Sequence, residues 1–169
     1  MDADDAIADL MRASGDRLLR LAYQLTHDRA SAEDLVQEAL MTVYRSWKRR
    51  SVVADHAEAY VRRAIVNEHI RRGRLHSSRE LVLAELPDRV DGSAFDAEHA
   101  ERDRVWTALS TLPARSRAVL VLRYYEDLPD REIADLVGCR ETTVRSLAAR
   151  GLAALRAPKV GLVAEGGVR

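Results

Sequence analysis

A stretch near the end of the chain carries side chains suited to recognising DNA. At about 100° per residue, a helix over residues 141–156 places Arg145 and Arg150 on either flank of a strip of small residues. The strip consists of Thr142, Ser146, Ala149 and Ala153. Small side chains let a helix approach base edges closely, and arginine binds guanine or phosphate with paired N–H groups. These residue types at this spacing are therefore suited to the recognition of DNA.

The surrounding residues fit a helix-turn-helix over 129–156. Ala134 falls where the two helices cross and only a small side chain fits. Gly138 falls at the tight turn, where a positive φ is most easily adopted by glycine. Val144 and Leu147 fall where the second helix packs on the first. Because these requirements are met together, the sequence predicts a second helix whose other face is free to enter a major groove.

An ordinary solvated helix is the alternative, since arginines are common on such faces. The shortage of acids argues against it, because Glu141 is the one carboxylate among four arginines that lie on this helix or directly before it. These are Arg140, Arg145, Arg150 and Arg156. A second basic cluster, countered by Glu68, consists of Arg62, Arg63, Arg71, Arg72 and Arg74. The net charge is zero, so acids elsewhere balance two basic surfaces; genome base composition equally explains the preference for arginine over lysine.

The elements that must carry these residues are helical throughout, because no run alternates convincingly over a strand length. The 169 residues suffice for one ordinary domain or two small ones. We expect an all-α fold of two small helical domains. The first, residues 1–76, holds one or two amphipathic helices, a helix that starts at Ser31, and a helix from about Ala57 to Arg74. The buried side of this last helix includes Val61, Ile65 and His69.

A polar segment separates the two domains. Residues 77–96 contain Pro87, Gly92 and an excess of acids over bases, which is typical of a flexible acidic linker. Residues 97–157 form the second domain and end in the helix-turn-helix, and residues 158–169 are expected to be a disordered tail.

Several classes of function are disfavoured. A single cysteine, Cys139, excludes an internal disulfide and a cysteine-cluster metal site, and its place at the turn indicates packing. The five histidines lack metal-ligand spacing, so we expect no catalytic residue, metal or cofactor. No apolar run approaches 18 residues and the N-terminus is acidic, so we expect neither a membrane span nor a signal peptide, and a cytoplasmic location.

A second motif lies in the N-terminal half: the segment DLVQEA at 34–39, followed by Tyr44 and Arg45. It resembles the core-binding helix of bacterial sigma factors, and the helix-turn-helix lies where their promoter-reading C-terminal domain is expected. With only these two domains, the chain is similar to the extracytoplasmic-function (group IV) sigma factors of the sigma-70 family. The resemblance covers residues 5–157.

The resemblance implies a transcription initiation factor that binds core RNA polymerase and directs it to −10 and −35 promoter elements. The partners it implies are the β′ clamp helices and β flap of the polymerase and promoter DNA; an anti-sigma factor stays open. The core-binding residues implied are Asp34, Gln37 and Glu38. The −10 DNA-binding residues implied are Tyr60, Arg62, Arg63, Asn67 and Arg71, with the loop 48–56 holding a flipped base. The −35 DNA-binding residues implied are Arg123, Thr142, Thr143, Arg145, Ser146 and Arg150.

The chain also departs from the family pattern. Ala59-Tyr60 stands where many relatives have tryptophan, Thr142 stands where many have glycine, and Glu141 adds a negative charge near the groove. These differences concern the promoter sequence read. The alternative function is a stand-alone helix-turn-helix regulator that binds duplex DNA as a dimer at palindromic sites. The sequence offers no coiled coil or ligand domain for it. A third interpretation, an adaptor that binds polymerase alone, does not explain the second basic helix.

Overall fold

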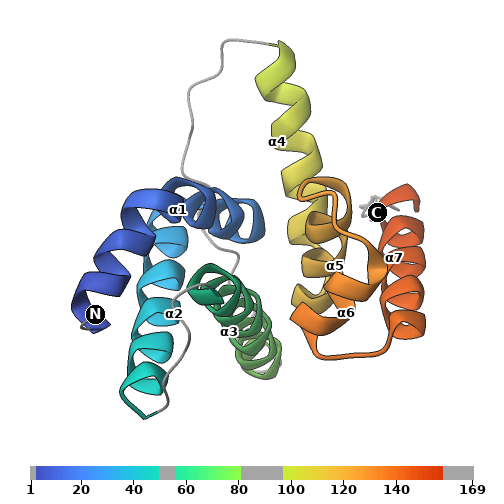
Figure 1. Ribbon diagram of the computed structural model, residues 1–169. Helices are drawn as coiled ribbons and strands as arrows, with labels where there is room; N and C mark the ends of the chain where they lie inside the picture. Colours follow the sequence, from blue (N-terminus) through green and yellow to red (C-terminus); the bar gives the residue numbers. More distant parts are fainter. Residues whose placement is uncertain (1–2, 50–55, 81–96, 158–169) are drawn as a thin grey trace, which may run out of the picture.

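The computed structural model describes residues 3–49, 56–80 and 97–157, and within these ranges the regular structure is helical (Figure 1). The N-terminal group comprises α1 (Ala3–Thr26), α2 (Arg29–Arg49) and α3 (Ala57–Glu80). The C-terminal group comprises α4 (Ala97–Ser110), α5 (Ala114–Tyr124), α6 (Asp130–Val137) and α7 (Glu141–Arg156). The predicted all-α class is therefore confirmed. None of these helices is both long and apolar enough to span a bilayer.

The first three helices form a bundle because each has an apolar stripe at three- and four-residue spacing. The stripes meet in a core whose fully buried members include Leu18, Leu21, Leu35, Val61 and Ile65. α1 is one continuous helix, where the sequence left one or two open. α3 continues to Glu80, so residues 77–80, which we assigned to the linker, are helical. The remaining linker residues 81–96, the tail 158–169 and residues 50–55 lie outside the described residues.

The predicted start of α2 at Ser31 is wrong. The helix begins at Arg29, because Asp28 caps it: the Ser31 N–H donates to Asp28 Oδ2 at 2.8 Å. Hydrogen bonds from the Ser31 side chain and then its backbone lower the pKa of Asp28. The preceding residue, His27, has a φ of +52° and ends α1. A turn of two residues thus reverses the chain between α1 and α2.

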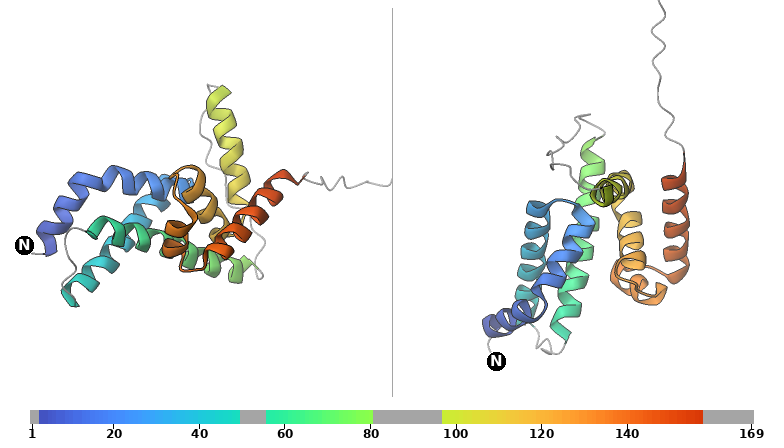
Figure 2. Two further views of the ribbon diagram at one scale, coloured as in Figure 1. Left: turned by 45° about the vertical axis from the view of Figure 1, so that its right-hand side comes forward. Right: turned by 90° about the horizontal axis from the view of Figure 1, so that it is seen from above.

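α5 is the central helix of the C-terminal group. Its residues Ala118 to Leu122 are all buried, although a surface helix would bury only one stripe. α5 contacts α6 and α7 of its own group and α1 and α3 of the other. The two groups therefore pack against each other side by side (Figures 1 and 2).

We call this contact between the groups the seam. Arg117 of α5 crosses it, and its Nη1 donates to the Leu25 carbonyl oxygen at the end of α1 at 3.3 Å. Its other nitrogens donate to the carbonyl oxygens of Leu109, Ser110 and Leu112 at 2.9 to 3.1 Å. One guanidinium thus satisfies carbonyl groups at the end of α4 and joins the two groups. Burial lowers the pKa of Arg117.

Two aromatic rings and two histidines complete the seam. His27 stacks on Trp106, with ring centroids 5.3 Å apart, and Trp106 stacks on Tyr125 at 5.1 Å. His69, which we predicted to face inward, is 6% exposed and lies beside the backbone of Ala114. Burial, helped by the charge of Arg117, lowers the pKa of His69 to about 4. The imidazole is therefore neutral at physiological pH.

Gly73 permits a very close approach in the seam. A Cβ atom at this position would lie 2.1 Å from the Cβ of Ala114. Since carbon atoms pack at roughly 3.5 to 4 Å, α3 and the start of α5 can meet here only if residue 73 has no side chain. This requirement concerns space, because Gly73 lies inside a helix.

The variant Gly73→Ala is expected to separate the two groups. Alanine favours the helical conformation by about 1 kcal/mol over glycine, so a loss of packing would not result from a less stable α3 helix. We expect a larger radius of gyration in small-angle X-ray scattering, and recovery of the wild-type value in Gly73→Ala/Ala114→Gly. An unchanged scattering profile of the single variant would show that the seam tolerates the methyl group.

Candidate nucleic-acid interface

The helix-turn-helix has the geometry that its sequence predicts. Gly138 adopts the left-handed region, with φ +71° and ψ +48°, and its N–H donates to the Ala134 carbonyl oxygen at 2.9 Å. The Cys139 N–H reaches the same oxygen at 3.0 Å. Ala134 and Val144 are buried where α6 and α7 meet. Cys139 is half-buried and packs on the core, as its position at the turn suggested.

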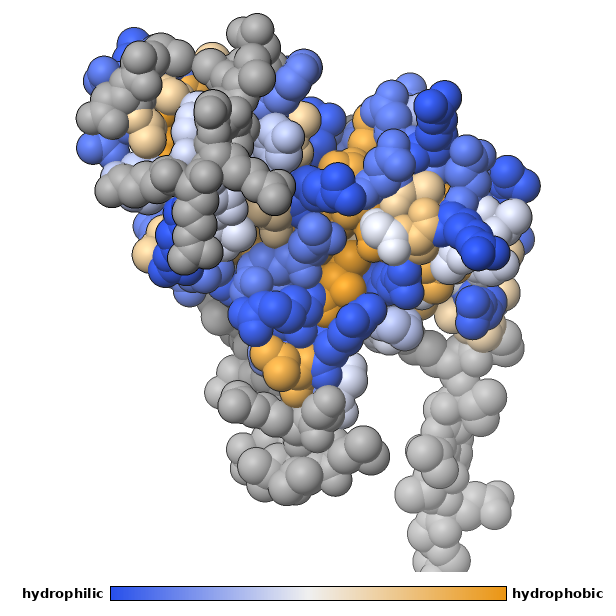
Figure 3. Space-filling model, turned by 60° about the horizontal axis from the view of Figure 1, so that its bottom comes forward, coloured by the Kyte–Doolittle hydropathy of each residue, from blue (hydrophilic) through white to orange (hydrophobic). Residues whose placement is uncertain are grey.

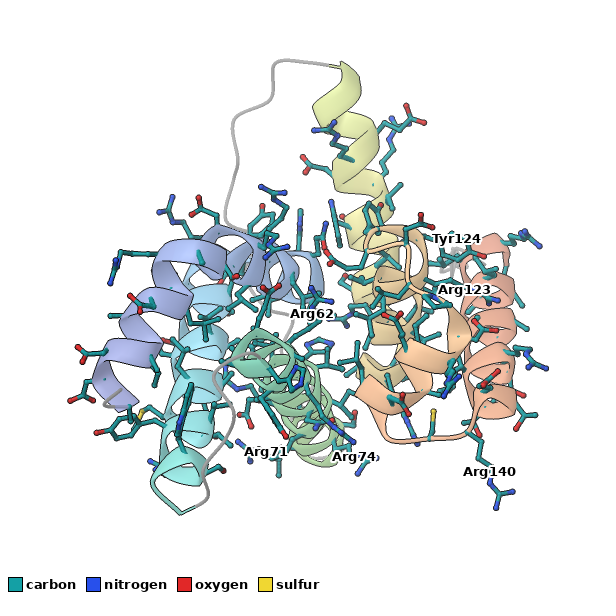
Figure 4. All side chains as sticks on the ribbon, viewed as in Figure 1. Arg62, Arg71, Arg74, Arg123, Tyr124 and Arg140 are labelled. Atoms are coloured by element: carbon teal, nitrogen blue, oxygen red, sulfur yellow. The ribbon has the colours of Figure 1, made fainter. Side chains whose placement is uncertain are left out.

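α7 presents the predicted DNA-reading face to solvent. Val144, Ala148 and Gly151 are buried, and a Cβ at Gly151 would lie 3.0 Å from Leu120 Cδ1 of α5. The opposite side is exposed and consists of Thr142, Arg145, Ser146, Ala149, Arg150 and Ala153. Thr143 is half-buried, and its N–H donates to the Arg140 carbonyl oxygen at 2.9 Å. Arg140 itself projects from the turn before α7 (Figure 4).

An ion-pair network joins α5, α6 and α7 beside this face. Asp130 Oδ1 lies 3.1 Å from Nη2 of Arg123, and its Oδ2 lies 3.4 Å from Nε of Arg145. Glu141 is a second partner of Arg145, at 3.5 Å from Nη2. The Arg145 side chain is 60% exposed and that of Asp130 only 20%. Sequence reasoning gave Asp130 no functional part, because its contacts exist only once the three helices are packed.

α3 carries a second exposed stripe. Tyr60, Arg63, Asn67 and Arg71 follow each other at three- and four-residue spacing and all face solvent. Arg71 donates from Nε and Nη2 to Glu68, each at 2.7 Å. These hydrogen bonds are the main reason that the pKa of Glu68 is lowered. Figure 4 shows Arg71 and Arg74 on this helix.

Arg62 departs from that stripe. Its side chain is 27% exposed and its Nη2 lies 3.3 Å from Glu58 Oε1. Glu58 also accepts from Arg17 at 2.7 Å and from the buried Ser14 hydroxyl at 2.6 Å. Arg62 therefore belongs to a polar contact between α1 and α3 and is set apart from the four residues of the exposed stripe.

α2 carries the third predicted surface. Asp34 and Gln37 are exposed and Glu38 is half-buried. A groove between α1 and α2 continues this face, lined mainly by Ile7, Ala8, Leu40, Met41 and Tyr44. The acidic face and an apolar patch thus adjoin on one side of the N-terminal group.

Apart from Arg62 and Arg123, the predicted site residues lie on three separate surfaces, on α2, α3 and α7. Figure 3 shows one face of the molecule, on which hydrophilic residues surround smaller hydrophobic patches. The flipped-base loop that we expected at 48–56 falls largely on residues outside the described ranges. Within the described ranges, no group of three histidine, cysteine, aspartate or glutamate residues is arranged to hold a metal ion.

Comparison with known proteins identifies the family. The family model Sigma-70 region 2 matches residues 10–79, and Sigma-70, region 4 matches residues 102–155. The RNA polymerase sigma-E factor of Streptomyces avermitilis is 36% identical over 151 residues, which cover 88% of this chain and 82% of that protein. The chain belongs to the sigma-70 family. It functions as an RNA polymerase sigma factor in transcription initiation.

Further relatives place this sigma factor in the extracytoplasmic-function group. The ECF RNA polymerase sigma factor SigL of Mycobacterium tuberculosis is 35% identical over 161 residues, 89% of each chain. A solved structure of the sigma factor RpoE from Bartonella quintana, in complex with the anti-sigma factor NepR, shares the fold. The TM-score is 0.55 at 21% identity, covering 88% of this chain and 93% of that one. Region 2 thus corresponds to α1–α3 and region 4 to α4–α7.

The variant Gly138→Ala is expected to destabilise region 4 by about 1 kcal/mol, because an L-residue in the left-handed region is strained. Nothing lies within 4 Å of an added Cβ, so the cost is conformational alone. Gly138→Asn should cost less, since asparagine tolerates this region. Urea denaturation measures the difference.

Gly15→Ala on α1 is the matched control, because its Cβ would meet only the flexible end of Met11. Equal stability of Gly138→Ala and wild type would contradict the requirement for a positive φ at the turn.

Proposed function

We propose that this sigma factor binds core RNA polymerase through α2 and directs it to promoter DNA through α3 and α7. One observation carries the proposal: on a chain of this family, an exposed acidic face lies in region 2, while exposed arginine-bearing faces lie in both regions. DNA does not attract an acidic face, whereas a protein partner with basic residues does.

In region 2, Asp34, Gln37 and Glu38 bind the β′ clamp helices. Their carboxylates pair with cations of the partner, and the adjoining groove at Met41 adds apolar contact. The exposed stripe of α3 holds the opened −10 strand. Tyr60 stacks on an unpaired base, Asn67 donates to and accepts from a base edge, and Arg63 and Arg71 contact phosphates.

The role of Arg62 follows from its surroundings. Its pairing with Glu58 makes it a weaker candidate for a phosphate contact than Arg63. When DNA arrives, Arg62 contributes charge from the edge of the stripe while Glu58 stays bound to Arg17.

In region 4, α7 enters the major groove of the −35 element. Arg145 and Ser146 read base edges, and Thr142 lies in the small-residue strip between the flanking arginines. Arg150, Thr143 and Arg123 contact the phosphate backbone and set the register of the helix. The β flap of the polymerase then holds region 4 in place while region 2 occupies the −10 element.

Promoter geometry requires the seam to open. By their position numbers, the −10 and −35 elements lie about 25 base pairs apart, which is roughly 85 Å at ~3.4 Å per base pair. In the packed molecule α3 contacts α5, and α5 contacts α7. Two successive helix packings separate the axes of α3 and α7 by only about 20 Å. A sigma factor that reads both elements at once therefore has its two regions apart.

The proposed role is one of binding, with no covalent step, so no catalytic residue or cofactor is assigned. It places the protein in the cytoplasm, where RNA polymerase and the chromosome are found. An anti-sigma factor could bind the groove between α1 and α2 or act on the seam. RpoE of Bartonella quintana binds a partner of this kind in its complex with NepR.

Run-off transcription with purified core RNA polymerase tests the function. Core enzyme plus this protein should give a promoter-specific transcript, and core enzyme alone should not. A footprint on a palindrome by the protein alone, without such a transcript, would instead establish the stand-alone regulator.

The variant Arg145→Ala is expected to weaken −35 recognition by roughly 1–3 kcal/mol, because a base contact is lost. The measurement is holoenzyme binding to promoters with a wild-type or a scrambled −35 element. Arg156→Ala removes an exposed arginine from the last turn of the same helix and serves as the control. Equal losses in both variants would mean that only net charge matters.

The double variant Gln37→Ala/Glu38→Ala is expected to reduce binding to core polymerase and to leave region 4 intact, because both side chains lie on α2. Co-purification with core enzyme measures the loss. Asp16→Ala, an exposed carboxylate on α1, controls for charge. Undiminished co-purification of the double variant would remove α2 from the proposed contact.

A further inference from the structure

The carboxylate of Asp130 stands between two arginines of region 4. It belongs to the first residue of α6, while Arg123 lies in the last turn of α5 and Arg145 lies on the exposed face of α7. Its Oδ1 lies 3.1 Å from Nη2 of Arg123, and its Oδ2 lies between the same Arg123 nitrogen at 3.3 Å and Nε of Arg145 at 3.4 Å. Arg123 is itself half-buried, at 32% side-chain exposure. Arg123 therefore fixes the position of the Asp130 carboxylate, which in turn restrains the Arg145 side chain.

The atom by which Arg145 is held matters for recognition. Asp130 lies closest to Nε, whereas a bidentate contact with guanine uses two N–H groups of the guanidinium edge. A carboxylate at Nε leaves the terminal Nη groups available for the guanine O6 and N7 atoms. It also restrains a long side chain that otherwise has many rotamers. Glu141 contacts Nη2 instead, at 3.5 Å, and competes with a base for the same group.

A carboxylate beside the groove also has a cost. It repels phosphates, so Asp130 lowers the affinity of region 4 for DNA of any sequence. Orientation and repulsion thus act on different quantities, because the first raises discrimination between bases and the second lowers total affinity. Removal of a residue that only stabilised the fold would not lower discrimination between bases while raising the total affinity for DNA.

We propose that Asp130 is a positioning residue that orients Arg145 to read a guanine of the −35 element. The proposal rests on the proposed function, since it concerns how the same face of α7 selects its sequence. Asp130 does not touch DNA in this arrangement and acts through the guanidinium of Arg145.

The test uses holoenzyme reconstituted from full-length protein and core polymerase, with promoters carrying each single base substitution in the −35 element. The position at which Arg145→Ala loses discrimination defines the base that Arg145 reads. At that position, Asp130→Asn should lose at least about fivefold in discrimination, the lower end of what a bidentate arginine–guanine contact contributes. Binding to a promoter with a scrambled −35 element should stay equal or increase.

Two further variants separate orientation from charge and from folding. Glu141→Gln removes the other carboxylate near Arg145 and should keep discrimination, whereas Asp130→Glu keeps a carboxylate and should restore part of it. Thermal unfolding of Asp130→Asn shows whether region 4 stays folded. Loss of discrimination in Glu141→Gln equal to that in Asp130→Asn would reduce the effect to charge and overturn the proposal.

A double-mutant cycle gives the decisive comparison. In an Arg145→Ala background, Asp130→Asn should have no further effect on discrimination. A full additional loss there, or wild-type discrimination in Asp130→Asn alone, would overturn the part assigned to Asp130. Absence of a promoter-specific transcript with the wild-type protein would instead refute the proposed function, so the two failures are distinguishable.

Discussion

The burial of α5 on all sides is the constraint on which the rest of the structure depends. Residues Ala118 to Leu122 are at most 3% exposed, and no amphipathic helix packed on one neighbour could achieve this. α6 and α7 cover part of α5, which fixes the helix-turn-helix, and α1 and α3 cover the rest. The geometry of the DNA-reading helix and the closed packing of the two regions therefore share one support. Gly151 and Gly73 are positions where neighbouring helices approach it very closely.

Several arginines of the proposed DNA-binding faces form ion pairs within the protein. Arg71, Arg123 and Arg145 each pair with a carboxylate in the unbound molecule. Ion pairs with exposed members contribute little to stability, so replacing a carboxylate by a phosphate or a base costs little. These ion pairs involve part of each basic surface, and acids elsewhere in the sequence supply the rest of the balance that makes the net charge zero.

Local sterics were readable in the sequence, whereas contacts between distant segments were not. The turn at Gly138, the buried Val144 and the exposed strip of α7 follow from spacing alone, and the structure agrees with each. Arg62 looked like its neighbour Arg63, because the Ser14 and Arg17 partners of Glu58 lie on another helix. The seam left no periodic signal, since Gly73 meets Ala114, and Arg117 meets Leu25, only after folding. The roles of individual residues toward polymerase and DNA stay predictions.

The seam also has a consequence for how tightly polymerase holds this protein. Under the proposed function, core enzyme binds the conformer in which the two regions are apart, so its apparent affinity is the intrinsic affinity multiplied by the fraction of molecules in that conformer. Every ~1.4 kcal/mol of packing between α3 and α5 weakens that apparent affinity about tenfold. Under the proposed function, the contacts of Arg117 and the close approach at Gly73 therefore tune how tightly core enzyme binds this protein, although neither residue is assigned to polymerase or DNA.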